Sequence, residues 1–240
     1  MIDKTERIKE IENGIFSVGV FDAGTYLKLN PYLIIQSNAA VLINFCSFKH
    51  FPQIIKNISS ITDIKKLKYI IVQSADVNIS AALPAFEHIF IGSNVEMLTH
   101  NLNLKNLTQL NLKSKIISLS EQKEIDIGGR KIINIEIAFC SGYPAIFSYD
   151  ITTKTLFTNS FMGSYSKNGD PSFKGKTEEI ELFRTFSVQR FSSKNEINKI
   201  LEKLKSLDIK RILPYYGPIV FGDNIKVLTD ELKGITYYAD

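Results

Sequence analysis

The sequence predicts an α/β protein in which helices cover both faces of a pair of sheets. Short runs of β-branched and aromatic residues alternate with stretches in which apolar residues recur every three or four positions. Their order is strands, helix, strand, helix, strands, helix, strand. At 240 residues, of which 44% are hydrophobic, the chain can bury a large core, and no linker divides it. We therefore expect one domain over residues 1–240.

Three short strands open the chain, and an amphipathic helix follows them. The strands are expected at 15–21, 32–36 and 40–45, because Gly, Pro or Asn separates these β-rich runs, as in an antiparallel meander. The stretch at 50–61 then places apolar residues three and four positions apart, which predicts a helix with one buried face. These residues are Phe51, Ile54, Ile55 and Ile58.

The middle of the chain continues with strands, a helix and a hairpin. The apolar run YIIV at 69–72 predicts a buried strand, and a helix follows it through about residue 90. The run IFIGS at 89–93 predicts another strand. The stretch at 124–139 alternates on both sides of Gly128-Gly129, a dipeptide suited to a tight hairpin.

The last third of the chain adds strands, a loop and the clearest helical pattern. The runs at 145–150 and 155–160 extend the sheet, and the Gly-, Ser- and Lys-rich stretch at 163–176 is expected to be a solvated loop. Ser193 and Glu196 can form a capping box, which predicts the start of a helix. A final strand and a turn bounded by Pro and Gly follow in RILPYYGPIV.

Charge and composition argue against several classes of function. Lys and Arg exceed Asp and Glu by 29 to 25, for a net charge of +4, and they are scattered, so nucleic-acid binding is not expected. The charged opening MIDKTERIKE and the absence of a long apolar run predict no signal peptide, no membrane segment and a cytoplasmic location. Cys46 and Cys140 have no CxxC spacing and are expected to be buried free thiols.

Polar side chains follow the strand at 69–72, where a turn leads into the next helix. Ser74, Asp76 and Asn78 lie in this turn, and side chains on such turns commonly bind ligands. Asp76 can either bind a cationic or hydrogen-bonding ligand or cap the helix that begins near Ser80. Both interpretations stay open from the residues alone.

Framework stretches along nearly the whole chain occur in a recognisable order. They are NPYLII, AVLINF, YIIV with SAALP, GGRKI, AIFSYDITTKTLFTNSFMG and ILPYYGPIV. In this order they resemble the metallo-β-lactamase fold, in particular its diiron branch of flavodiiron and oxygen-binding diiron proteins. The resemblance implies a four-layer αββα sandwich of two mixed sheets flanked by helices. The chain stops where an attached flavodoxin module would begin, so no flavodoxin domain is expected.

The resemblance also implies where metal ligands would stand, and most of these positions hold poor ligands. The family turn reads His-x-Glu-x-Asp-His, and by register its ligands fall on Ser74, Asp76, Asn78 and Ile79. The later His, the bridging Asp and the final His fall on Ser141, Ser160 and Tyr216. A further family Asp corresponds to Asn44. Only Asp76 keeps a carboxylate.

One carboxylate cannot hold two irons. The irons bring several positive charges into a partly buried pocket, where imidazoles and carboxylates must replace the lost water. Hydroxyls of Ser and Tyr ionise far above pH 7, Asn is neutral, and Ile79 offers no donor atom. We therefore expect no metal, no cofactor and no catalytic residue here. The polar side chains are expected to hydrogen-bond to one another, and the same positions are the candidate lining of a ligand pocket. Tyr143 and Tyr215 are expected either to line this pocket or to fill its space.

No other residues supply a metal site or a nucleophile with its base. His50, His88 and His100 lack the spacing of metal ligands and are expected to be surface or capping residues. The three serines assigned to the site have no histidine among the site residues to act as a base.

Three interpretations of function follow. The first is a metal-free pseudoenzyme that acts as a binding, sensory or scaffold module for an unknown protein or small-molecule partner. The alternative is a diiron-dependent enzyme with displaced ligands, either an oxidoreductase acting on oxygen or nitric oxide or a hydrolase. The third is nucleic-acid binding, which the diffuse charge disfavours. The resemblance also implies a homodimer.

Overall fold

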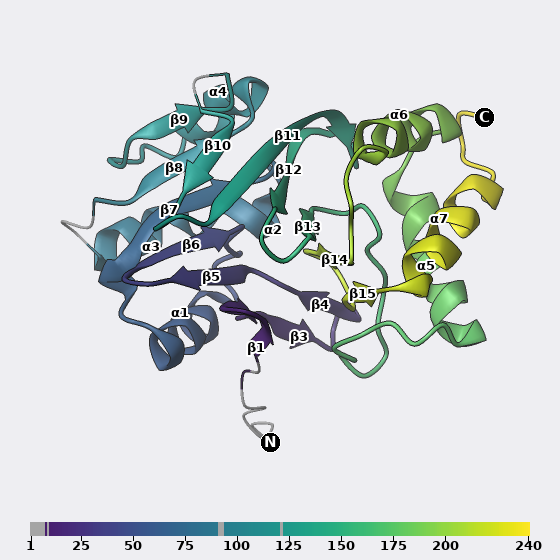
Figure 1. Ribbon diagram of the computed structural model, residues 1–240, viewed down its shortest axis with the longest axis horizontal. Coiled ribbons are helices and arrows are strands. Elements are labelled where there is room, and N and C mark those ends of the chain that lie inside the picture. Colours follow the sequence, from purple (N-terminus) through teal and green to yellow (C-terminus); the bar gives the residue numbers. More distant parts are fainter. Residues whose placement is uncertain (1–7, 9, 91–93, 121) are drawn as a thin grey trace.

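The computed structural model is a sandwich of two mixed sheets with helices on both outer faces (Figure 1). It describes residue 8 and residues 10–90, 94–120 and 122–240. Figure 1 shows α5, α6 and α7 grouped on one side of the molecule, and α1 and α3 on the other. The predicted α/β class with two mixed sheets and flanking helices is confirmed.

The first sheet combines an antiparallel meander with a parallel half. Its strands, in spatial order, are β1 (Glu10–Glu12), β2 (Ile15–Ser17), β5 (Tyr32–Gln36), β6 (Ala39–Ile43), β7 (Leu67–Val72), β8 (Glu96–Thr99) and β9 (Ile116–Ser118). Strand β5 pairs antiparallel with β2 and β6, whereas β6 to β9 run parallel. A separate hairpin pairs β3 (Val20–Asp22) with β4 (Leu27–Leu29).

The second sheet is antiparallel except for one central pair. Its strands, in spatial order, are β10 (Glu124–Asp126), β11 (Lys131–Cys140), β12 (Tyr143–Asp150), β13 (Thr155–Thr158), β14 (Arg211–Pro214) and β15 (Val220–Phe221). Strands β13 and β14 are parallel. The predicted hairpin between β10 and β11 is confirmed, and Gly128 and Gly129 adopt φ values of +71° and +89° there, which glycine tolerates best.

Three apolar clusters hold the layers together. One lies between the sheets, a second joins the first sheet to its helices, and a third joins the second sheet to α5, α6 and α7. The helices are α1 (Phe51–Ile61), α2 (Val77–Ser80), α3 (Leu83–Ile89), α4 (Leu104–Thr108), α5 (Thr177–Arg190), α6 (Lys194–Leu204) and α7 (Asp223–Gly234), with 3-10 turns at Ile64–Lys66 and Asn101–Asn103. None of the helices in the described part of the chain is long and apolar enough to cross a membrane.

Several local predictions need correction. The strand predicted at 89–93 is wrong at its start, because Ile89 ends α3 and the Phe90 ring packs on Phe86, with their centroids 4.9 Å apart. Residues 91–93 lie outside the described residues, and the strand that follows is β8. Helices α5 and α7 were not predicted. The apolar residues of α5 do not gather on one face of the helix, so the sequence shows no periodic stripe there.

The loop at 163–176 is less solvated than expected. Ser164 and Phe173 are 2% and 3% exposed, and the Phe173 N–H donates to the carbonyl of Ile219 at 2.9 Å. Cys46 and Cys140 are buried free thiols, as predicted. Burial raises the pKa of each thiol to about 12.

The segment that follows β14 is tied to both β4 and the 163–176 loop. The Asn30 side chain donates to the carbonyl of Gly217 at 2.7 Å, and the Gly217 N–H donates to the carbonyl of Lys28 at 2.8 Å. From the loop, the Ser164 N–H donates to the carbonyl of Tyr216 at 3.1 Å. This close approach fixes the backbone on both sides of Tyr216.

Replacing Gly217 with alanine should destabilise the fold. The residue has φ +95°, and an added Cβ would lie 2.3 Å from the carbonyl oxygen of Ser164. Gly129 is a matched control, since it has φ +89° and no described atom within 4 Å of an added Cβ. In urea denaturation, Gly217→Ala should lower the free energy of unfolding by about 1–3 kcal/mol more than Gly129→Ala. Equal losses would show that the backbone contact does not constrain this segment.

Candidate functional site

The turn between β7 and α2 centres on the carboxylate of Asp76, which is 7% exposed. Its Oδ1 accepts the N–H of Asn78 at 2.8 Å, so Asp76 is the N-cap of α2. Its Oδ2 accepts the hydroxyl of Tyr216 at 2.5 Å. Both oxygens of this carboxylate are therefore engaged by hydrogen bonds from within the protein.

Tyr216 and Tyr215 bring the end of β14 into contact with this turn. Both rings are fully buried, with their centroids 4.8 Å apart and their planes perpendicular. Burial raises the pKa of Tyr216, and the adjacent charge of Asp76 raises it further, so its hydroxyl stays protonated and donates. The Tyr215 hydroxyl lies 2.5 Å from the carbonyl oxygen of Asn78. The two tyrosines thus join the second sheet to the start of α2.

Ser74 belongs to a second set of polar contacts beside Asp76. Its Oγ accepts the side-chain amide of Asn159 at 2.7 Å and lies 3.4 Å from the N–H of Asp76. The Ser160 hydroxyl and the side-chain oxygen of Asn159 are buried and have no hydrogen-bond partner among the described residues. A buried polar group without any partner costs about 1–3 kcal/mol, so these two atoms mark positions where the described part of the protein supplies no hydrogen bond of its own.

The remaining positions of the turn and of the β6 end are structural. Ile79 is fully buried within the apolar cluster under the first sheet. The Asn44 side chain donates to Gln73 Oε1 at 2.8 Å, and its own oxygen accepts the Gln73 N–H at 3.0 Å. Gln73 also donates to the carbonyl of Phe157 at 3.0 Å, which links the two sheets. Sequence reasoning missed Gln73, because its partners are distant along the chain.

Ser141 and Tyr143 belong to the β11–β12 hairpin, and among the described residues neither has a hydrogen bond to Asp76 or Tyr216. Ser141 and Gly142 form the turn between β11 and β12 with positive φ values, and the Ser141 N–H donates to Glu196 Oε1 at 3.2 Å. Tyr143 is 41% exposed at the start of β12. The tight turn leaves Tyr143 at the exposed end of the hairpin, so it neither fills space beside Asp76 nor belongs to the buried cluster. Of the two tyrosines expected there, only Tyr215 is present.

The histidines take structural roles on other elements. His100 is the N-cap of the 3-10 turn at Asn101–Asn103, and its Nδ1 accepts the N–H of Leu102 at 3.1 Å. Its Nε2 therefore carries the proton and faces Glu136 at 3.1 Å. His50 precedes α1 and faces Asp22 at 3.4 Å, and His88 is exposed on α3.

The donor set does not fit a pair of irons. Asp76 is the sole carboxylate among the implied ligand positions, and both its oxygens already accept hydrogen bonds. Across the described ranges, no group of three or more His, Cys, Asp or Glu residues is placed to hold a metal ion. The arrangement can position protons and hydrogen bonds, but it lacks the imidazoles and carboxylates that a diiron centre needs.

A cation that sequence reasoning missed covers the outer side of Tyr216. The guanidinium carbon of Arg190, at the end of α5, lies 4.8 Å from the centroid of the Tyr216 ring. It also lies 5.2 Å from the centroid of Phe186, one turn earlier on the same helix. Since α5 itself showed no periodic pattern, no signal in the sequence pointed to this cation–π contact.

Two curated proteins are similar to the chain over most of its length. The flavo-diiron protein FprA2 of Clostridium acetobutylicum is 24% identical to this chain, and the alignment covers 95% of this chain and 63% of that protein. An uncharacterized protein of Methanocaldococcus jannaschii is 28% identical over 232 residues, which cover 88% of this chain and 56% of the relative. The chain thus spans less than two thirds of the length of either relative.

Solved structures share the fold. The flavodiiron protein from Giardia intestinalis has a TM-score of 0.86 at 18% identity, with coverage of 96% of this chain and 59% of the other. The structure described as a peroxy diiron species of the chemotaxis sensor ODP has a TM-score of 0.77 at 16% identity, with coverage of 96% and 95%. A model of the family described as "ODP family beta lactamase" matches residues 27–217. Because this match covers most of the chain, the protein belongs to the ODP family of metallo-β-lactamase-fold domains, which is related to the flavodiiron proteins.

Proposed function

We propose that this protein is a metal-independent member of the ODP family that serves as a binding, sensory or scaffold module. The observation that carries the proposal is the pairing of Asp76 with Tyr216 at 2.5 Å in a buried site. The one carboxylate left at the implied ligand positions holds a tyrosine hydroxyl and a helix N–H. Its neighbour Ile79 is part of the apolar core.

Electrostatics favours this arrangement over a bound metal. A metal at Asp76 would compete with the Tyr216 hydroxyl for the carboxylate, and this single carboxylate would face the metal's charge in a buried site. Charges that are buried without adequate partners are strongly destabilising. Loss of partners that merely orient ligands already lowers metal affinity about 10- to 100-fold, and here the ligands themselves are replaced.

One protein with the same fold supports a role in sensing for this chain. One protein of the same fold is described as a chemotaxis sensor, so this fold can serve in sensing. That structure is also described as a peroxy diiron species. This chain keeps the fold with a different set of side chains at the implied ligand positions, which favours recognition of a partner or ligand over diiron chemistry.

Protein purified without chelator should contain well below one iron or zinc per chain. Added ferrous iron or zinc should leave its thermal midpoint unchanged, because a metal stabilises only a fold that binds it. Elemental analysis and thermal denaturation measure both quantities. The Asp76→Asn variant is the matched control, because it removes the sole carboxylate of the site with little change in shape.

Two metals per chain in the wild-type protein, lost in Asp76→Asn, would contradict the proposal. A wild-type midpoint that rises with metal while the variant's does not would contradict it as well. Either result would favour the alternative of a metal-dependent oxidoreductase or hydrolase with displaced ligands.

If hydrogen bonds have replaced metal at this site, then the Tyr216 hydroxyl should contribute to stability. Tyr216→Phe keeps the ring but leaves a buried carboxylate oxygen of Asp76 without its donor. We expect the free energy of unfolding at pH 7 to fall by about 1–3 kcal/mol. Tyr143→Phe, which removes a hydroxyl from a 41% exposed ring, should change it by less than about 0.5 kcal/mol. Urea denaturation that finds equal effects for the two variants would show that the network is not stabilising.

A further inference from the structure

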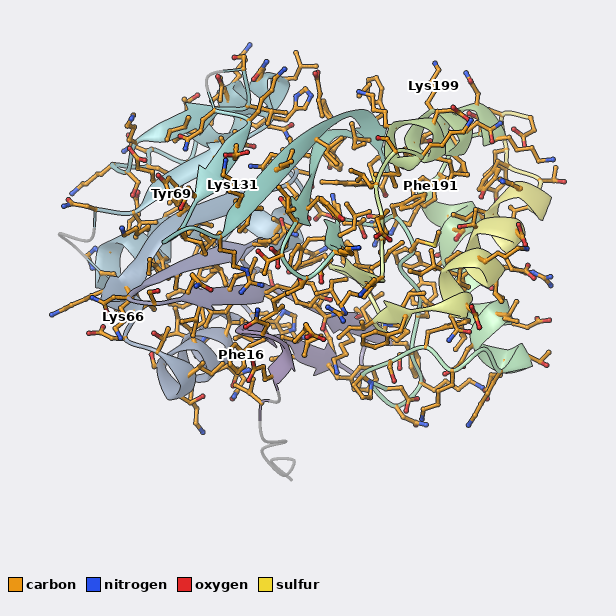
Figure 2. The ribbon with its side chains drawn as sticks, in the orientation of Figure 1. Phe16, Lys66, Tyr69, Lys131, Phe191 and Lys199 are labelled. Atoms are coloured by element: carbon orange, nitrogen blue, oxygen red, sulfur yellow. The ribbon has the colours of Figure 1, made fainter. Side chains whose placement is uncertain are left out.

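A pocket of about 660 Å³ opens around Arg190, where several segments of the chain meet. Its walls come from the end of α5, the β11–β12 hairpin and the start of α6, together with Tyr165 and Tyr238, and we call it the Arg190 pocket. Among its lining residues are Arg190, Ser141, Glu196, Val188 and Phe139. Phe191, which also lines it, is labelled in Figure 2 and lies on the side of the molecule that α5, α6 and α7 form.

Arg190 differs from the other described arginines in having no anionic partner. Arg130 pairs with Asp150, Arg184 with Glu231 and Arg211 with Glu12, each within 2.7 Å. Among the described residues, the contacts of the Arg190 guanidinium are with the rings of Phe186 and Tyr216, and none is an ion pair or a hydrogen bond. A guanidinium has five N–H donors, so Arg190 keeps its donor capacity for a ligand.

The two aromatic rings also hold Arg190 in place. The guanidinium carbon lies 4.8 Å and 5.2 Å from their centroids, and the side chain is partly buried. A cation that is already ordered loses less conformational freedom when a ligand binds to it. The hydrogen bond from the Tyr216 hydroxyl to Asp76 holds the Tyr216 ring in place. Asp76 therefore stabilises the aromatic surface against which Arg190 packs.

The remaining walls restrict the kind of anion. The Glu196 carboxylate accepts the N–H of Ser141 at 3.2 Å and the N–H of Ser192 at 2.9 Å, so its negative charge is fixed at the pocket. That charge repels any anion, but it repels a doubly charged phosphate more strongly than a singly charged carboxylate, which can still pair with the planar guanidinium. Val188 and the 58% exposed ring of Phe139 offer apolar surface.

We propose that the Arg190 pocket binds a small organic carboxylate, with the carboxylate group on Arg190 and an apolar body against the aromatic and aliphatic wall. This inference rests on the proposed function, because it supplies the metal-independent module with a class of ligand. The site involves two of the implied ligand positions, since Ser141 lines the pocket and the Tyr216 ring lies against Arg190.

Isothermal titration of the protein with sodium benzoate tests the proposal. The wild-type protein should bind benzoate at one site per chain, and more tightly than inorganic phosphate or neutral benzamide. Arg190→Gln should weaken benzoate binding about tenfold or more, because it removes a charge-assisted pair of hydrogen bonds. Arg190→Lys keeps the charge but loses the planar fork, and should weaken binding to an intermediate extent.

Arg184→Gln is the matched control, because it makes the same change of charge on the same helix at a residue paired with Glu231. It should leave benzoate binding within about twofold of wild type, since the effect of an exposed charge is screened. The ligand-free thermal midpoint of each variant verifies that it is folded. Absence of benzoate binding, tighter binding of phosphate, or equal losses in Arg184→Gln and Arg190→Gln would overturn the proposal.

Metal analysis of the same samples separates the two proposals. Metal-free protein that does not bind benzoate would overturn the carboxylate site and leave the proposed function standing. Stoichiometric metal would overturn the proposed function together with this inference.

Discussion

The hydrogen bond from the Tyr216 hydroxyl to the Asp76 carboxylate joins parts of the fold that lie far apart in the sequence. Asp76 caps α2 beyond β7 in one sheet, and Tyr216 follows β14 in the other. The contact is buried on both sides, so the charge of the carboxylate depends on its two donors for compensation. The ring of Tyr216 in turn supports Arg190 at the end of α5. One interaction thus connects a helix cap, the end of strand β14 and a surface pocket.

The backbone of the turn after β7 and the side chains that it carries make different contributions to the site. The turn after β7 still directs polar groups toward the end of β14, as a ligand-bearing turn would. Ser74 and Asn78 hold other protein groups, and Ile79 lies in the core. Ser160 is buried, and its hydroxyl has no hydrogen-bond partner among the described residues. Family membership is therefore compatible with a turn whose polar groups bond to the protein itself.

Much of the fold was predictable from local signals. The spacing of apolar residues in α1, the Gly128-Gly129 hairpin and the Ser193 cap of α6 each depend on neighbours within a few positions. The cap at Asp76 was one of two interpretations that the sequence left open, and the helix was expected to begin near Ser80, whereas α2 begins at Val77. Helix α5 was not predicted, because its apolar residues do not share one face and tertiary packing decides its placement. Tyr143 was misplaced since a tight turn, rather than its residue type, decides its exposure. The contact of Arg190 with Tyr216 could be identified only from the structure, because α5 and the segment after β14 are distant along the chain.

The central claim is that Asp76 holds Tyr216 and not a metal. Anomalous X-ray diffraction from crystals soaked in ferrous iron or zinc tests this claim most directly, because it locates bound metal atom by atom. We expect no anomalous peak at the coordination distance of about 2 Å from the Asp76 carboxylate. We also expect the tyrosine hydroxyl to remain in place beside Asp76. One or two strong peaks at the carboxylate, with Tyr216 displaced, would show that Asp76 binds metal instead.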